Sequence, residues 1–154
     1  MKPKVYSRLY VHLVFATWNR QGYLLDRWRE EVFKYISGIL KGKGHTPIAV
    51  GGTKDHIHIL CGYKPVIPIS DIVRDVKRSS SAFINSKKNF KFKFGWQEGY
   101  GAFSVGHGDL NGVSKYIMNQ EEHHRKSSFR KEYLQLLEIS GIEYDSMYLF
   151  QFSE

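Results

Sequence analysis

Two histidines one residue apart, His56 and His58, are the residues of this sequence whose type and spacing point most directly to chemistry. They lie in an apolar run, residues 55–60, that alternates with the period of a β-strand, so both imidazoles are predicted to project from the same face of a sheet. Two imidazoles held side by side on a strand form half of a binding site for a divalent metal ion. Two histidines on the polar face of an ordinary strand would give the same pattern, and these residues alone leave both interpretations open.

A tyrosine and a glutamine four residues apart can complete such a site. Tyr116 and Gln120 lie in a segment predicted to be helical, where this spacing places both side chains on one face. Glutamine offers a carbonyl oxygen to a metal ion, and tyrosine offers a hydroxyl nucleophile. Together with His56 and His58 they would equip a site for metal-assisted phosphoryl transfer through a covalent phosphotyrosine. The pair is common on helices, however, and by itself indicates little.

Strands and helices follow one another along the chain in an order that can position these residues. The patterns predict a strand over 5–17, a helix beginning near 25 and ending at 41–44, a hairpin over 46–63 with its turn at 52–55, a helix over 69–86, an extended segment over 90–104, and helices over 110–126 and 128–139. Glycines gather in residues 106–112, directly before the tyrosine helix, and predict a flexible hinge. No repeat or long linker divides the sequence, so residues 1–154 are predicted to form a single domain.

The charge balance favours a polyanionic partner. The 154 residues include 23 Lys and Arg against 15 Asp and Glu, a net charge of +8, which points to nucleic acid before a membrane surface. No apolar run approaches the length of a membrane span, and the N-terminus does not have the features of a secretory signal. The single cysteine, Cys61, cannot form an internal disulfide, and a cytoplasmic location is expected.

Two basic segments are candidates for contacts with nucleic acid. The predicted second helix carries Arg74, Lys77 and Arg78 on its exposed face, where they can reach phosphates or simply be solvated. Lys91 and Lys93 alternate with phenylalanines, which places cations beside rings that can stack on unpaired bases. An ordinary amphipathic strand would show the same alternation.

Taken in order, the motifs resemble the small tyrosine transposases of the IS200/IS605 insertion-sequence type, which belong to the HUH endonuclease superfamily. The resemblance rests on residues 55–60, 96–105 and 116–120, on the histidines that follow at 123 and 124, and on residues 143–150. It covers nearly the whole chain.

The resemblance implies a ferredoxin-like α+β sandwich, in which helices pack on an antiparallel sheet and a C-terminal tyrosine-bearing helix follows the glycine-rich hinge. His56 and His58 match the HUH histidines, Gln120 the third metal ligand and Tyr116 the nucleophile. Such transposases use Mg²⁺ or Mn²⁺ to cleave and rejoin single-stranded DNA beside imperfect hairpins through a 5′-phosphotyrosine. They are homodimers in which the tyrosine helix of one subunit can complete the metal site of the other.

Three other functions fit the same residues. The chain can be a domesticated relative that nicks repeat hairpins, a non-catalytic protein that binds DNA hairpins, or a metal hydrolase unrelated to DNA, which the charge of +8 disfavours. His123 and His124 are additional imidazoles beyond Gln120. His123, seven residues after Tyr116, stays near the same helix face and can contact DNA or the metal, but a surface role is expected.

Overall fold

The structure, a computed structural model, describes residues 4–18, 24, 26–87 and 93–152. Its helices and strands are, in chain order, β1 (Leu9–Ala16), α1 (Asp26–Gly42), β2 (Thr46–Gly52), β3 (His56–Tyr63), α2 (Ile69–Ser86), β4 (Gly101–Val105), α3 (Leu110–Met118), α4 (Gln120–His124) and α5 (Phe129–Ile139). The strands form one sheet in the order β2-β3-β1-β4, and all neighbouring strands are antiparallel. This is the ferredoxin-like sandwich that the sequence predicts.

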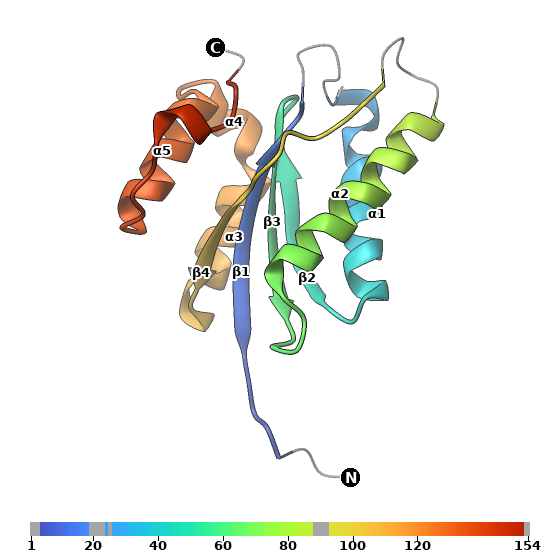
Figure 1. Ribbon diagram of the computed structural model, residues 1–154, viewed down its shortest axis with the longest axis vertical. Coiled ribbons are helices and arrows are strands. Elements are labelled where there is room, and N and C mark those ends of the chain that lie inside the picture. Colours follow the sequence, from blue (N-terminus) through green and yellow to red (C-terminus); the bar gives the residue numbers. More distant parts are fainter. Residues whose placement is uncertain (1–3, 19–23, 25, 88–92, 153–154) are drawn as a thin grey trace.

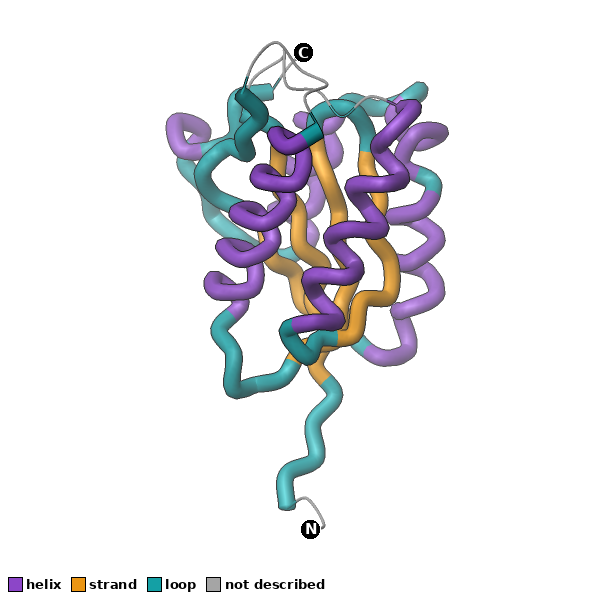
Figure 2. The backbone as a smooth tube through the Cα atoms, turned by 90° about the vertical axis from the view of Figure 1, so that its right-hand side faces the viewer, coloured by secondary structure: helices purple, strands orange, loops and turns teal. Residues whose placement is uncertain are grey.

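Helices cover both faces of the sheet. Figure 1 shows α1 and α2 on one side of the strands and α3 and α5 on the other, and the view in Figure 2 shows helices packed across the strands. None of the helices that the structure describes is long and apolar enough to cross a membrane.

The two faces of the central strands β1 and β3 differ in chemistry. Because side chains alternate along a strand, Ile57 and Ile59 of β3 pack into the large core beneath α1 and α2, whereas His56 and His58 face the layer of α3 and α5. All four of these residues are 0% exposed. Both faces of β3 are therefore buried, and one of them carries polar groups.

Several predicted boundaries need correction. The strand predicted over 5–17 begins only at Leu9, and Val5 and Tyr6 are exposed on a segment that extends away from the body (Figure 1). Of the extended segment predicted over 90–104, the described part pairs as a strand only in β4, apart from an isolated bridge between Trp96 and Thr17. The hairpin and α2 are confirmed.

The predicted helix over 110–126 is interrupted. It divides at Asn119, whose backbone angles (φ −106°, ψ 23°) leave the helical range, so α3 ends at Met118 and α4 begins at Gln120. The tyrosine helix α3 is therefore followed by the short helix α4 and then by α5, which corresponds to the helix predicted over 128–139. The glycine-rich segment before it contains a short 3₁₀ turn, His107–Asp109, and its action as a hinge stays a prediction.

Gly51 of β2 allows α3, the helix that carries Tyr116, to pack closely against the sheet. A Cβ at Gly51 would lie 2.5 Å from the carbonyl oxygen of Ile117, the residue that follows Tyr116. Ile117 is fully buried and packs with Ala49 and Leu60 in a small second core on this face of the sheet. The absence of a side chain at Gly51 thus lets α3 lie directly on the sheet of its own chain.

The variant Gly51→Ala should displace the end of α3 because backbone cannot move aside as a flexible side chain can. We expect the free energy of unfolding in urea to fall by about 1–3 kcal/mol. Gly38→Ala is the matched control, because a Cβ at this α1 position meets nothing within 4 Å and alanine favours a helix. Equal stability of the two variants would show that the close contact between α3 and Gly51 does not exist in the folded protein.

Candidate active site and metal centre

The four residues singled out by the sequence lie together. On β3, His56 and His58 present their Nε2 atoms to the same side, and the Nε2 of His56 lies 3.0 Å from the Oε1 of Gln120. The Tyr116 ring stands edge-on to the His58 ring, with 5.8 Å between their centroids. All four side chains belong to one chain.

A carboxylate that the sequence patterns did not reveal lies at the centre of this group. Glu132 of α5 is 2% exposed, and its Oε1 lies 3.1 Å from the Nε2 of His58 and 3.4 Å from the Nε2 of His56. Its Oε2 accepts hydrogen bonds from the Tyr116 hydroxyl and from the Nε2 of Gln120. The sequence does hold a signal for this residue, because Glu132 falls on the apolar stripe of its helix, between Phe129 and Tyr133.

Both histidines of α4 contact Glu132: the side chain of His124 is mostly buried at 12% exposure, whereas that of His123 is 32% exposed. The Nε2 of His124 lies 3.0 Å from the Oε1 of Gln120 and 3.0 Å from the Oε1 of Glu132. The Nε2 of His123 lies 3.5 Å from the other carboxylate oxygen of Glu132. The interruption at Asn119 starts a new helix, and this helix turns both imidazoles towards the site.

The Nδ1 atoms of the two β3 histidines lie within hydrogen-bonding distance of neighbouring side chains. Asp55 Oδ1 lies 2.9 Å and Thr53 Oγ1 3.0 Å from the Nδ1 of His56, while the Nε2 of His12 lies 2.8 Å from the Nδ1 of His58. Such partners orient an imidazole and leave its other nitrogen for a ligand. The arrangement on β3 therefore presents both Nε2 atoms to the centre of the site.

Burial and charge together set the protonation states around Glu132. Burial lowers the pKa of His58, and it lowers the pKa of His12 to about 3, helped by the nearby His58. Burial alone would also lower the pKa of His56, but its hydrogen bonds with Asp55 and Glu132 raise that pKa to about 9. Burial would raise the pKa of Glu132, yet hydrogen bonds with three imidazoles hold it far below its usual range.

Tyr116 is a neutral phenol in this environment. Burial and the charge of Glu132 both raise the pKa of its hydroxyl, and the hydrogen bond to the carboxylate has the same effect. The hydroxyl consequently keeps its proton and directs it at Glu132.

The donor atoms fit a divalent metal ion. His56, His58 and Glu132 are all buried and each offers one ligand atom, and these atoms lie within 4.8 Å of one another. Imidazole nitrogens with a carboxylate oxygen are a common ligand set for first-row transition metals. The buried cluster can therefore hold a metal ion.

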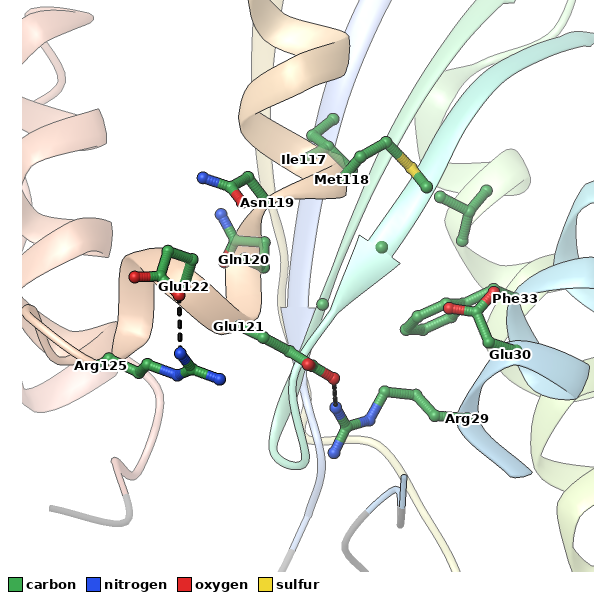
Figure 3. Close-up of a pocket in the computed structure, with 13 residues that line it drawn as sticks. Arg29, Glu30, Phe33, Ile117, Met118, Asn119, Gln120, Glu121, Glu122 and Arg125 are labelled. Carbon is green, nitrogen blue, oxygen red and sulfur yellow. Dashed lines mark hydrogen bonds and ion pairs between the residues drawn. The ribbon is translucent and has the colours of Figure 1, made fainter. Parts of the chain in front are cut away.

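Two surface pockets border the site. One, of about 400 Å³, is lined by Tyr116 together with the charged residues Lys115, Lys126 and Glu122. The other, of about 340 Å³, opens beyond Gln120 between α1, β2 and the junction of α3 with α4 (Figure 3). There Arg29 of α1 binds Glu121 of α4 at 2.7 Å, which ties the two helical layers together.

The predicted contacts with nucleic acid lie elsewhere. Arg74, Lys77 and Arg78 belong to α2, across the sheet from Tyr116 (Figure 1). Lys77 is not a free phosphate contact, because its Nζ donates to the carbonyl oxygens of residues 97 and 99 at 2.8 and 2.7 Å. Arg74 pairs with acidic neighbours on its own helix, whereas Arg78 and Lys93 are exposed. Lys91 lies outside the described residues.

Comparison with known proteins gives a family match and two structural neighbours. The model of the family described as "Transposase IS200 like" matches residues 5–120. A structure of a proposed transposase from Deinococcus radiodurans R1 is 23% identical, with a TM-score of 0.61, and the match covers 78% of this chain and 96% of that one. A REP-associated tyrosine transposase bound to a REP hairpin is 15% identical, with a TM-score of 0.56, and the match covers 100% of this chain and 96% of that one. At these identities the two structures show a shared fold. Among curated proteins, none matches the chain.

The raised pKa of His56 makes a prediction for the metal-free protein. A proton bound more tightly in the folded state stabilises it fully below pH 6.5, and this stabilisation is lost as pH rises through about 9. With EDTA present, we expect the free energy of unfolding to fall by roughly 2–3 kcal/mol between pH 6.5 and 9. Urea titrations across this range measure it, and His56→Gln should flatten the dependence. A wild-type profile as flat as that of His56→Gln would contradict the assignment.

Proposed function

The chain belongs to the IS200-like transposase family, and from that premise we propose that it cleaves and rejoins single-stranded DNA with Tyr116 as the nucleophile. The observation that carries the proposal is the meeting of Tyr116 with His56 and His58 around one buried carboxylate. A nucleophilic hydroxyl beside a metal-ligand set is the arrangement that metal-assisted phosphoryl transfer requires.

The residues of the site suit an attack on phosphorus. The chemistry that a divalent ion bound by His56, His58 and Gln120 supplies is polarisation of the scissile phosphate. The Tyr116 oxygen forms a bond to phosphorus while the bond from phosphorus to the 3′ oxygen breaks. The hydrogen bond to the Oε2 of Glu132 orients the Tyr116 hydroxyl; its proton leaves as the bond to phosphorus forms, and the departing 3′ oxygen takes up a proton to become a hydroxyl. The products are a 5′-phosphotyrosine and a free 3′-hydroxyl, whose reaction with each other at a new junction rejoins the strand.

The pocket beside Tyr116 suits an approaching DNA strand. Lys115 and Lys126 line it together with the nucleophile, so phosphates on either side of the scissile one would meet cations. We propose hairpin DNA as the substrate, as in the structural neighbour that is bound to a REP hairpin. Arg78 and Lys93 lie farther away and would contact DNA outside the reacting strand.

The same geometry supports an active site built from one chain. Tyr116 reaches His58 of its own chain, and Gly51 accommodates the residue that follows it. Sharing of the site between subunits is not required to bring these groups together, and the homodimer stays a prediction.

The variant Tyr116→Phe tests the nucleophile. A labelled single-stranded oligonucleotide that carries a hairpin should form a covalent adduct with the wild type in Mn²⁺ or Mg²⁺, resolved by denaturing electrophoresis. Loss of the hydroxyl should reduce the adduct by at least about 10³-fold. Tyr148→Phe, at a tyrosine that is 83% exposed, is the matched control and should react like the wild type. An adduct that persists in Tyr116→Phe would assign the attack to another group.

Variants of the histidines separate catalysis from binding. His56→Ala and His58→Ala should abolish the adduct and leave the Kd for the hairpin within about threefold, because phosphate contacts dominate affinity for DNA. Electrophoretic mobility shifts with the same oligonucleotide measure this Kd. Tight binding by the wild type without any adduct in either metal would instead identify a non-catalytic hairpin-binding protein.

A further inference from the structure

The two pockets that border the candidate active site are neighbours. The larger pocket, of about 400 Å³, is lined by Tyr116, and the smaller pocket, of about 340 Å³, is lined by Gln120. Asn119, where the helix is interrupted, and Glu122 line both of them. A DNA strand whose phosphate lies at Tyr116 can therefore place an adjoining nucleotide in the smaller pocket.

The charged groups that line the two pockets differ in balance. In the smaller pocket three carboxylates stand against two guanidinium groups: Glu30, Glu121 and Glu122 against Arg29 and Arg125. Arg29 already binds Glu121 at 2.7 Å, and Arg125 already binds Glu122 at 2.8 Å. In the larger pocket two lysines stand against one carboxylate. The larger pocket therefore favours phosphate, whereas the smaller pocket favours a neutral group that donates hydrogen bonds.

Apolar side chains also line the smaller pocket. Phe33 of α1 and Val50 of β2 are 6% and 7% exposed, and Met118 at the end of α3 is 62% exposed. Figure 3 shows the side chains of α1 on one side of this pocket and those of the junction of α3 with α4 on the other. A flat ring can pack its faces against such apolar groups while its polar edge meets the carboxylates. An unpaired nucleobase has this shape and this chemistry.

Glu30 is the carboxylate of the smaller pocket that is left to bind a base. Within the described part of the chain no ion pair or hydrogen bond engages its side chain, whereas the other two carboxylates are paired. Adenine, cytosine and guanine carry an amino group that donates to a carboxylate, whereas thymine presents a carbonyl oxygen at the corresponding position. A carboxylate at this place therefore discriminates against thymine.

We propose that the smaller pocket binds one unpaired base next to the phosphate that Tyr116 attacks, and that Glu30 selects a base with an amino group over thymine. The inference rests on the proposed function for the path of the strand. It gives the protein its own preference for sequence beside the cleaved bond, separate from its contacts with phosphates.

The test compares the affinities of DNA hairpins that differ at one unpaired base. Each probe has thymine at every position of its single-stranded flanks, and in each variant probe cytosine replaces one of these thymines. Fluorescence anisotropy measures the Kd with Tyr116→Phe, which lacks the nucleophilic hydroxyl. At one flank position cytosine should lower the Kd by at least about fivefold, because one good pairing of a side chain with a base discriminates by about 5–150-fold.

The variant Glu30→Gln, made in the Tyr116→Phe protein, identifies the selecting group. A glutamine amide both donates and accepts, so it can bind the thymine carbonyl as well as the cytosine amino group. The two Kd values should then agree within about twofold, through tighter binding of the thymine probe, a gain that misfolding cannot produce. Glu31→Gln is the matched control and should keep the preference, because Glu31 pairs with Lys87 at 2.7 Å and does not line the pocket.

Equal affinity for all probes, or a preference for cytosine that Glu30→Gln leaves unchanged, would overturn the proposal. The adduct assay with Tyr116 intact separates this result from the proposed function. A protein that forms the adduct but binds all probes equally retains the transposase chemistry and loses the base pocket. A protein that forms no adduct but shows the preference that depends on Glu30 retains the pocket and loses that chemistry.

Discussion

The buried carboxylate of Glu132, a residue that is 2% exposed, is the polar group that joins the elements of the second helical layer. An ionised carboxylate withdrawn from water is strongly destabilising unless opposite charges or hydrogen bonds surround it. Its partners come from β3, α3 and α4, and each can reach it only if its own element is docked. Around it Phe129 stacks on the His56 ring at 3.9 Å, which seals the site from the side of α5. One buried carboxylate therefore links α3, α4 and α5 to β3, in addition to their apolar packing.

The two faces of the sheet differ in composition, and the candidate functional residues lie on one of them. The face beneath α1 and α2 is an apolar core whose residues follow simple alternation and helical spacing, and it needs no polar group to be stable. The opposite face carries the small cluster around Ile117 and the rings of Phe129, Tyr133 and Phe150, and its middle is polar. The site therefore lies on a face whose helices dock through both apolar side chains and the polar contacts of Glu132.

This division explains what the sequence could predict. Alternation and turn residues locate the β2–β3 hairpin and α2 almost to the residue, because these elements bury a regular apolar stripe. His56, His58, Tyr116 and Gln120 are found from residue type and spacing with the help of a family resemblance. The sequence does not predict the role of Glu132, because that role depends on which imidazoles lie opposite its helix in the folded protein. The sequence does not predict the interruption of the helix at Asn119 either, since the residues on both sides of it follow a helical pattern. The carbonyl partners of Lys77 could not be predicted either, because they lie some twenty residues away in the sequence.

Glu132 also couples the nucleophile to the metal ligands. Its Oε1 faces the imidazoles and its Oε2 accepts the hydrogen bond of the Tyr116 hydroxyl, so one carboxylate contacts both the candidate metal ligands and the candidate nucleophile. If α5 moved, the ligand set and the orientation of the hydroxyl would change together, because both depend on the same carboxylate. The pair of histidines on β3 thus acts with a helix more than seventy residues later in the chain.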